Sequence, residues 1–430
     1  MSTKPKNFIL LVEIVERELP ASVLVGAELA KRGHTVWLIE KGRFRKSPAS
    51  FPPSIVLEKG LSKGCLSRFR SIRGAGHVLA VMCQEGFIYR SGEDYIQRRV
   101  HAETIDNIDY LFLWGERQKQ DLRQFLGKVR GFFVTGNPRI DLLLGRFRKS
   151  WQPEADVIRA KHGDFVLFTS RFSAVNHFRR SLDETLDRRK EQYTEAAEAT
   201  VGERYEIRKQ LFADYMQTIE ETARRLPELK FVVRPHPNEN ADVWKERFAG
   251  IGNVEICDEG AATPWLSSAR CVVHNACTTG IEAYLLDRPV IEYHPANIPR
   301  GEFDPVFPGQ VTGSCDSVEG LAEWIKTHAH GETPKARDAG TEELVAFYLQ
   351  NYKEPDAYRD MADAMEGFRA PGLLAALRNR LSGKHDARKM QQRYFGVEDV
   401  DRLLKAYVAC DLGDKFTPAV VDDVGIRLVS

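Results

Sequence analysis

Short hydrophobic runs alternate with longer amphipathic stretches along most of the chain. The first run covers residues 8–14, a stretch with helical spacing covers 21–32, and residues 35–39 are rich in β-branched and aromatic side chains. Gly33 follows the helical stretch at a position where helices commonly end. A strand, a helix and a second strand in this order predict a βαβ unit with parallel strands.

The same alternation continues to about residue 293. Further strand-like runs cover residues 77–82, 110–114, 131–135, 165–170, 230–234, 254–257, 271–274 and 289–293. A long charged helical stretch, residues 182–225, suggests a partial surface excursion. Charged residues and Pro153 interrupt the alternation between residues 146 and 163, which we interpret as a domain boundary. The pattern predicts an α/β protein with two Rossmann-like domains, 1–150 and 151–330, whose parallel sheets face a central cleft, and a helical C-terminal extension, 331–430.

Length and composition narrow the class of protein. A chain of 430 residues is longer than a domain with a single hydrophobic core usually is, which indicates more than one domain. Its formal net charge of +1 does not favour a nucleic-acid partner. The seven cysteines include no CxxC pair, so neither a metal motif nor a redox motif is indicated, and a reducing cytoplasm is the expected location. No apolar stretch approaches the roughly 20 residues of a membrane span. Two basic stretches, 41–46 and 67–73, suit peripheral contact with anionic headgroups at the inner face of the membrane, although solvated surface is commoner.

Polar motifs follow the strand-like runs of the second half, where open parallel sheets bind their ligands. Arg234 and His236 come directly after residues 230–234, and Pro235 and Pro237 restrict the turn that holds them. A guanidinium and an imidazole in such a turn suit a phosphate or a sugar carboxylate. A rigid loop with a surface histidine is an equally good interpretation.

The second motif runs from His274 and Asn275 through Thr278, Thr279 and Glu282. The threonines lie where a helix begins, so their hydroxyls and nearby N–H groups suit phosphate, and Glu282 suits ribose hydroxyls. The same spacing fits a capping box with Thr279 as N-cap and Glu282 at N3. The two interpretations are compatible. Neither motif matches a dinucleotide fingerprint or a P-loop.

A polar loop after the first strand of the second half adds further candidates. Ser170 and Asn176 lie in it and offer donors and acceptors to a sugar or phosphate. An ordinary loop before a helix explains them equally well.

Carboxylates follow three strand-like runs of the first half. Glu16, Glu85 and Asp141 are candidates for a general base or a nucleophile toward a sugar, and Arg139 lies in the same motif as Asp141. For each carboxylate a structural role is the simpler alternative: Asp141 could cap a helix, and Glu16 could pair with Arg17. No acidic pair of the kind that binds a divalent ion follows a strand, so no cofactor or metal is expected.

Seven motifs occur in an order that resembles a known family. They are ERELPASVLVGAELAKRGH, QEGFIY, LFLWGE, VTGNPRIDLL, FTSRFSAVNHF, RPHPNE and HNACTTGIEAYLLDRPVI, spread over residues 8–293. Together they resemble the bacterial surface carbohydrate biosynthesis proteins related to the β-Kdo glycosyltransferases of O-antigen synthesis and, more distantly, the capsule Kdo transferases. QEG departs from the EEG that is usual in that family, so the role of position 84 does not carry over.

This resemblance implies a GT-B fold and a glycosyltransferase of surface polysaccharide synthesis that uses CMP-Kdo. The RPHP and CTTGIE segments would hold the CMP phosphate and ribose, and an acidic group, Asp141 or Glu85, would act at the anomeric carbon. The acceptor would be a glycan or a lipid-linked saccharide. Two alternatives stay open: a CDP-glycerol or UDP-sugar-dependent transferase or epimerase, and a non-catalytic subunit of a polysaccharide assembly machine.

Overall fold

The computed structural model divides the chain into two compact units. It describes residues 4–181, 183–184, 187, 201–298, 304–330, 337–371, 395–412, 420–422 and 425–428, so much of the predicted excursion at 182–200 lies outside the described residues. Unit 1 comprises residues 1–87, 99–150 and 346–430, and unit 2 comprises residues 88–98 and 151–345. Unit 1 is therefore assembled from three stretches of chain, between which both stretches of unit 2 are inserted.

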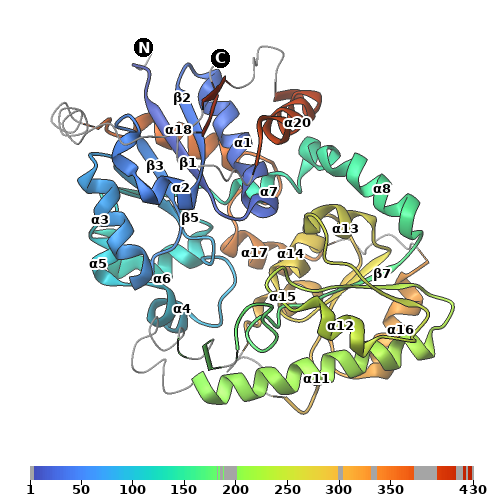
Figure 1. The fold of residues 1–430 in the computed structure, drawn as a ribbon. Helices are drawn as coiled ribbons and strands as arrows, with labels where there is room; N and C mark the ends of the chain where they lie inside the picture. The colour runs from blue at the N-terminus through green and yellow to red at the C-terminus, as the bar shows by residue number, and fades with distance from the viewer. Residues whose placement is uncertain are drawn as a thin grey trace. The chain divides into compact units, whose positions relative to one another are not determined.

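An eight-stranded sheet forms the centre of unit 1. Its strand order is β13-β14-β2-β1-β3-β4-β5-β6, in which β1 to β6 are parallel and β14 runs antiparallel to β2. The strands are β1 (Asn7–Val12), β2 (Thr35–Glu40), β3 (Ile55–Glu58), β4 (Val78–Met82), β5 (Tyr110–Leu113), β6 (Gly131–Val134), β13 (Val420–Asp422) and β14 (Gly425–Leu428). Figure 1 shows β1, β2 and β3 in blue beside α1. All described side chains of β1 after Asn7 are buried, as expected for a strand covered on both faces.

The helices of unit 1 come from both ends of the chain. They are α1 (Val15–Lys31), α2 (Lys41–Lys46), α3 (Leu66–Gly74), α5 (Ala102–Ile105), α6 (Glu116–Leu126), α7 (Pro138–Asp141), α18 (Ala357–Gly367) and α20 (Val397–Tyr407). Short 3-10 turns cover Pro48–Ser50, Lys63–Cys65 and Gly145–Trp151, and a π-helical turn covers Val408–Leu412. Helix α1 begins six residues before the predicted start at residue 21 and contains Pro20.

The division differs from the predicted domain boundaries at the C-terminus. Residues 331–430 are not an extension of their own, because 346–430 belong to unit 1. Helices α18 and α20 pack against α1, and β14 extends the sheet beyond β2. The buried side chains of Ile426 and Leu428 explain why this end of the chain joins the core of unit 1. The C-terminal part is helical over α18 and α20, but it also supplies strands.

A second, all-parallel sheet forms the centre of unit 2. Its order is β12-β11-β10-β7-β8-β9. The strands are β7 (Val166–Thr169), β8 (Phe231–Arg234), β9 (Val254–Ile256), β10 (Cys271–His274), β11 (Val290–Tyr293) and β12 (Ser314–Cys315). The helices are α8 (Gln152–His162), α11 (Val201–Arg225), α12 (Ala241–Arg247), α13 (Ala262–Ser268), α14 (Thr278–Leu285), α15 (Phe307–Thr312), α16 (Val318–His328) and most of α17 (Ala339–Tyr348) and α4 (Gly92–Arg99).

Ion pairs explain why a short piece of the first half belongs to unit 2. Asp94 on α4 pairs with Arg204 on α11 at 3.1 Å and with Arg98 at 2.7 Å. Aromatic residues fill the core between α11 and the sheet, with Tyr215, Phe231 and Trp244 almost completely buried. The sequence predicted the boundary between residues 146 and 163, and the main division falls between Ser150 and Trp151.

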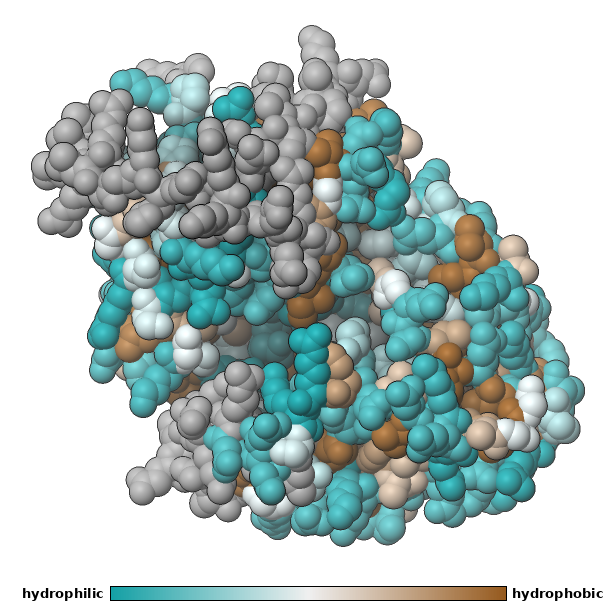
Figure 2. Space-filling model, viewed as in Figure 1, coloured by the Kyte–Doolittle hydropathy of each residue, from teal (hydrophilic) through white to brown (hydrophobic). Residues whose placement is uncertain are grey.

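The described surface is mainly polar. Figure 2 shows hydrophilic residues over much of the visible face, with hydrophobic residues scattered among them. Large hydrophobic side chains that are exposed in the described part of the chain are Phe132, Val157, Phe178 and Val306. None of the described helices is long and apolar enough to cross a membrane.

Candidate functional site

Each parallel sheet has one topological switch point, where the strand order changes direction. In unit 2 the chain runs from β7 outward to β8 and β9, then returns to place β10 on the other side of β7. In unit 1 it runs from β1 to β2 and then places β3 on the other side of β1. The crevice beyond the carboxyl ends of the strands at such a point is the usual ligand site of an open α/β sheet.

Hydroxyl and thiol groups line the switch point of unit 2. Thr169 ends β7, and its Oγ1 lies 2.8 Å from Oγ1 of Thr279 at the start of α14. Sγ of Cys277 lies 2.6 Å from the same Thr279 hydroxyl. These contacts join the end of β7 to the helix that follows β10. They give this point a polar and uncharged lining.

The start of α14 is held close to the sheet. Cys277 is the N-cap and makes no side-chain hydrogen bond to the helix start, so the predicted capping box with Thr279 as N-cap is wrong. Ala276 has a φ of 51°, a left-handed conformation that is uncommon for a residue with a side chain. A Cβ on Gly280 would lie 2.4 Å from Nε2 of the fully buried His274. The His274 ring therefore packs against α14 at Gly280. Its ring nitrogen Nε2 lies 2.9 Å from Oγ1 of Thr312.

A buried carboxylate that the sequence analysis missed organises the neighbouring loops. Glu239 accepts hydrogen bonds from the Ser170 hydroxyl at 2.8 Å, the Phe172 backbone N–H at 2.6 Å and the Trp244 indole at 3.0 Å. Burial raises the pKa of Glu239 to about 7, against the hydrogen bonds that favour its anion. The Ser170 hydroxyl also accepts the backbone N–H of His236 at 3.3 Å. Glu239 thus fixes the loop after β7 against the loop after β8.

Asn176 completes this pairing of loops. Its side-chain amide donates to the carbonyl of Asn240 at 3.1 Å, and its own carbonyl accepts the backbone N–H of Asn240 at 3.0 Å. Asn176 is buried and acts here as a structural link between two loops. Ser170 is likewise buried, with its hydroxyl engaged by Glu239.

The RPHP turn holds its two polar side chains differently. Arg234 is buried, donates to the carbonyl oxygens of Glu259 at 2.7 Å and of Gly260, and lies over the Trp265 ring. Its guanidinium thus secures the loop after β9. This contact gives no support to the predicted phosphate contact. Burial lowers the pKa of Arg234 to about 10.

His236 is half-buried, and Nδ1 of its ring accepts the backbone N–H of Asn238 at 3.1 Å. The neutral tautomer with its proton on Nε2 is therefore favoured. Pro237 is exposed beside it. The turn thus presents a histidine whose orientation is fixed by the backbone.

Two arginines that sequence analysis did not select lie at the same edge. Nε of Arg171 donates to the Asn275 carbonyl at 2.6 Å, and both Arg171 and Arg208 pair with Asp304, Arg208 at 2.7 Å. The two guanidinium groups hold the pKa of Asp304 at about 2, against its burial. Asp304 thus joins two guanidinium groups at this edge.

These groups line a small pocket. Its lining includes Phe172, Arg208, Tyr215, Asn275, Tyr293 and Asp304. Oδ1 of Asn275 is buried without a hydrogen-bond partner among the described residues. An unpaired buried acceptor is costly, so a donor from a ligand would be favoured there. Glu282 on α14 is also buried.

Charged side chains line the switch point of unit 1. Oε2 of Glu13, which follows β1, lies 2.8 Å from Nζ of Lys41 and 2.8 Å from Nζ of Lys59. Glu18 is buried, pairs with Lys59 and accepts the backbone N–H groups of Glu13 at 2.8 Å and Ile14 at 3.2 Å. The lysines and hydrogen bonds lower the pKa of Glu13 to about 2 and also lower that of Glu18, although burial opposes both shifts. These backbone contacts explain why α1 begins before Pro20.

The predicted catalytic residues of unit 1 do not gather at this point. Asp141 is completely buried, and its carboxylate accepts the backbone N–H groups of Ala357 at 3.1 Å and Tyr358 at 2.7 Å, at the start of α18. Burial raises its pKa well above the usual value. These contacts correspond to the capping alternative, and they give no support to a catalytic role.

The other candidates of unit 1 differ in exposure and partners. Glu85 is half-exposed and lies 3.7 Å from Arg99. Glu16 is exposed in the first turn of α1, and it is Glu18 rather than Glu16 that pairs with Arg17. Arg139 is partly buried in α7. Their catalytic roles stay predictions.

Comparison with known proteins supports the fold. No family model matches the chain, and no curated protein matches it in sequence. Among solved structures, the wall teichoic acid polymerase TagF is 10% identical, with a TM-score of 0.51, over 85% of this chain and 89% of TagF. A TagF variant soaked with CDPG is 12% identical, with a TM-score of 0.52, over 85% of this chain and 88% of its own.

A Listeria monocytogenes protein described as a UDP-N-acetylglucosamine 2-epimerase is 13% identical, with a TM-score of 0.51, over 84% of this chain and 96% of its own. At such identities the likeness concerns the fold alone. Two Rossmann-like units with parallel sheets and a partly helical C-terminal part define the GT-B class, as the sequence predicted.

Proposed function

We propose that the protein is a glycosyltransferase of surface polysaccharide synthesis that binds a nucleotide-activated sugar at the switch point of unit 2. Our preferred donor is CMP-Kdo or a related CMP-sugar, and the acceptor is a glycan or a lipid-linked saccharide. The motif series in the sequence supports this choice of donor. The likeness in fold to a teichoic acid polymerase is consistent with it.

The observation that carries the proposal is the set of groups that meets at this switch point. The threonine hydroxyls of Thr169 and Thr279 lie beside the start of α14, whose N-cap offers no side-chain hydrogen bond. The N–H groups and dipole at a helix start favour an anion, and a nucleotide phosphate is the natural one. The guanidinium of Arg171, next along the loop from Ser170, supplies a positive charge at the same edge.

A CMP-Kdo donor also carries a carboxylate beside its anomeric carbon. The guanidinium groups of Arg171 and Arg208 beside Asp304 suit that carboxylate, since guanidinium binds carboxylates in a paired geometry. Transfer would pass through an oxocarbenium-like state, which an ionised carboxylate stabilises.

Calorimetric titration of the full chain with CMP, CDP, UDP and ADP tests the proposal. We expect CMP to bind more tightly than the others, and Thr279→Val to weaken CMP roughly tenfold through loss of one hydroxyl contact. The matched control is Thr327→Val on the exposed side of α16, which should bind CMP like the wild type. Equal binding of CMP by both variants would remove the switch point of unit 2 from the proposal.

A second candidate is a CDP-alcohol or UDP-sugar enzyme. The fold of this chain is also that of a TagF variant soaked with CDPG and of a protein described as a UDP-GlcNAc 2-epimerase. Preference for CDP or UDP over CMP in the same titration would favour this candidate. Failure to bind any of the four nucleotides would favour the non-catalytic assembly subunit.

A further inference from the structure

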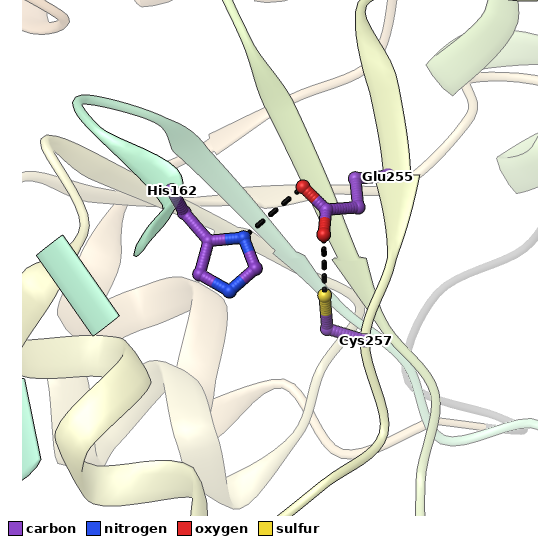
Figure 3. Close-up of side chains that lie close together, drawn as sticks. All are labelled: His162, Glu255 and Cys257. Carbon is purple, nitrogen blue, oxygen red and sulfur yellow. Dashed lines mark hydrogen bonds and ion pairs between the residues drawn. The ribbon is translucent and has the colours of Figure 1, made fainter. Parts of the chain in front are cut away.

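Three side chains of different chemistry meet at the β8–β9 edge of the unit 2 sheet. Figure 3 shows His162, the last residue of α8, pointing toward Glu255 on β9, with Cys257 just beyond that strand. Nδ1 of His162 lies 3.1 Å from Oε2 of Glu255, and Sγ of Cys257 lies 3.5 Å from Oε1. One ligand atom from each residue lies within 4.8 Å of the other two. The proposed nucleotide site does not use any of them.

These separations are close to those of ligands around a tetrahedral zinc ion. Bond lengths of about 2.0–2.3 Å at tetrahedral angles place neighbouring N, O and S ligands about 3.4–3.6 Å apart. The contacts of Glu255 with His162, 3.1 Å, and with Cys257, 3.5 Å, are near this range. An imidazole, a carboxylate and a thiolate are also the three side-chain types that zinc binds in proteins. Only a small closure between His162 and Cys257 is needed for all three to reach one ion.

The surroundings favour a cation. His162 ends the eleven-residue helix α8, and the carboxyl end of a helix carries partial negative charge. The imidazole is almost fully buried against Trp265, at 5.0 Å between ring centroids, which restricts its orientation. The Glu255 side chain is 38% exposed, so a water molecule can complete the coordination.

One group competes with a metal ion. Nζ of Lys230, just before β8, lies 2.8 Å from Oε2 of Glu255, the same oxygen that faces His162. The Lys230 ammonium group therefore already pairs with the Glu255 carboxylate. Oε1 faces the thiol, so this oxygen is the better placed ligand.

We propose that His162, Glu255 and Cys257 form a zinc site that joins the end of α8 to the edge strand β9, with Lys230 as the competing cation. On binding, the Cys257 thiol releases its proton to solvent and its sulfur coordinates the ion as thiolate, without any change of oxidation state.

The site has a structural consequence for unit 2. Helix α8 is the first helix after the division at residue 150, and β9 is an edge strand. An ion that binds only the folded unit stabilises it by mass action. At a hundredfold excess over Kd, we expect the Tm of unit 2 to rise by roughly 5 °C or more.

Zinc and cobalt titrations of the metal-stripped full chain test the proposal. Competition with a chromophoric chelator should give one zinc ion per chain, and Co²⁺ should produce a thiolate-to-cobalt charge-transfer band in the near ultraviolet. Cys257→Ser and His162→Gln should each weaken zinc roughly 100-fold and abolish or distort the band. Lys230→Gln should bind zinc roughly fivefold more tightly, since a competing charge is gone.

The matched control is Cys315→Ser on β12, the other half-buried cysteine of unit 2, which should behave as the wild type. Absence of stoichiometric zinc binding would overturn the proposal. So would a Cys257→Ser variant with wild-type affinity, or a Lys230→Gln variant without any gain. CMP titration of the same variants should give wild-type affinity, which keeps this test separate from that of the proposed function.

Discussion

Each unit has a switch point beside its first strand, but the strand orders and the linings of the two points differ. In unit 1, Glu13 and Glu18 are neutralised by Lys41 and Lys59 beyond β1, β2 and β3. In unit 2, hydroxyl groups and one thiol meet between β7 and α14, and the nearest arginine is bound to a carbonyl and to Asp304. The unit 1 edge thus depends on a cluster of ion pairs, whereas the unit 2 edge combines neutral hydrogen bonds and close packing at the start of α14 with the ion pairs of Arg171 and Arg208. We therefore expect the two edges to respond differently to pH and to loss of one side chain.

The largest expected effect is the loss of Lys59. Lys59→Met leaves the buried Glu18 without its lysine and removes one partner of Glu13, so we expect the free energy of unfolding to fall by about 3 kcal/mol at pH 7. Both carboxylates have lowered pKa values, so their ion pairs stabilise the fold above pH 4.5 and are lost as the pH falls toward 2. The difference from the wild type should therefore shrink at pH 3. Urea unfolding at both pH values measures it.

A control for this variant is Lys119→Met, which removes the exposed pair with Glu116 on α6. We expect a loss below about 1 kcal/mol that hardly changes with pH. Equal effects of the two substitutions would mean that the charged cluster is no more than ordinary surface.

The second effect concerns Glu239, which joins the loops after β7 and β8 in unit 2. Its pKa of about 7 exceeds the value of 4.5 for an unperturbed glutamate, so the folded state holds the proton longer than the unfolded state. The stability that this proton provides is complete below pH 4.5 and is lost as the pH rises to 7, by roughly 3 kcal/mol. Glu239→Gln should lack this change. Unfolding free energies at pH 5 and pH 7.5 decide the question, with Glu246→Gln on the exposed face of α12 as the control.

The third effect compares one glycine from each unit. Gly280→Ala drives a Cβ into the buried His274 ring, and we expect a loss of about 2 kcal/mol together with weaker CMP binding. Gly26→Ala on α1 meets the end of the Leu428 side chain at 3.0 Å. Because this side chain can move and alanine favours a helix, its effect should stay within about 1 kcal/mol. Thermal unfolding of both variants would contradict this contrast if Gly26→Ala proved the more damaging.

The smallest expected effect on stability is that of Thr279→Val. It removes the contact with Thr169 and should cost about 1 kcal/mol. Because no charge is involved, the loss should be the same at pH 5 and pH 8. A clear pH dependence would mean that the edge of unit 2 is electrostatically coupled after all.

The sequence predicted the strands best where nearly every side chain of the strand is buried. Strands such as β1, β10 and β11 are covered on both faces, so each is an uninterrupted apolar run that the pattern identifies. Strand β3 was missed because it follows closely after Pro52 and Pro53, which indicate a turn or loop. Strand β14 was missed because its pairing with β2 joins residues almost 400 positions apart.

The candidate sites were predictable by position but not by role. Polar residues after strands do lie at the carboxyl edges, as the topology requires. Whether a side chain is available depends on distant partners: Arg234 is held by carbonyls 25 and 26 residues away, and Asp141 by a helix start 216 residues later. Glu239 was missed because nothing local distinguishes it from a solvated loop glutamate. The indole of Trp244, five residues later, is one of the donors that bind the buried Glu239 carboxylate.

The cap that Asp141 provides for α18 also bears on how the chain is made. During synthesis, residues 151–345 leave the ribosome before 346–430, so unit 2 can complete its sheet while unit 1 still lacks α18, α20 and β14. Until Ala357 and Tyr358 arrive, the Asp141 carboxylate has neither of its backbone partners. The N-terminal unit is therefore the last to be finished, although its chain is begun first.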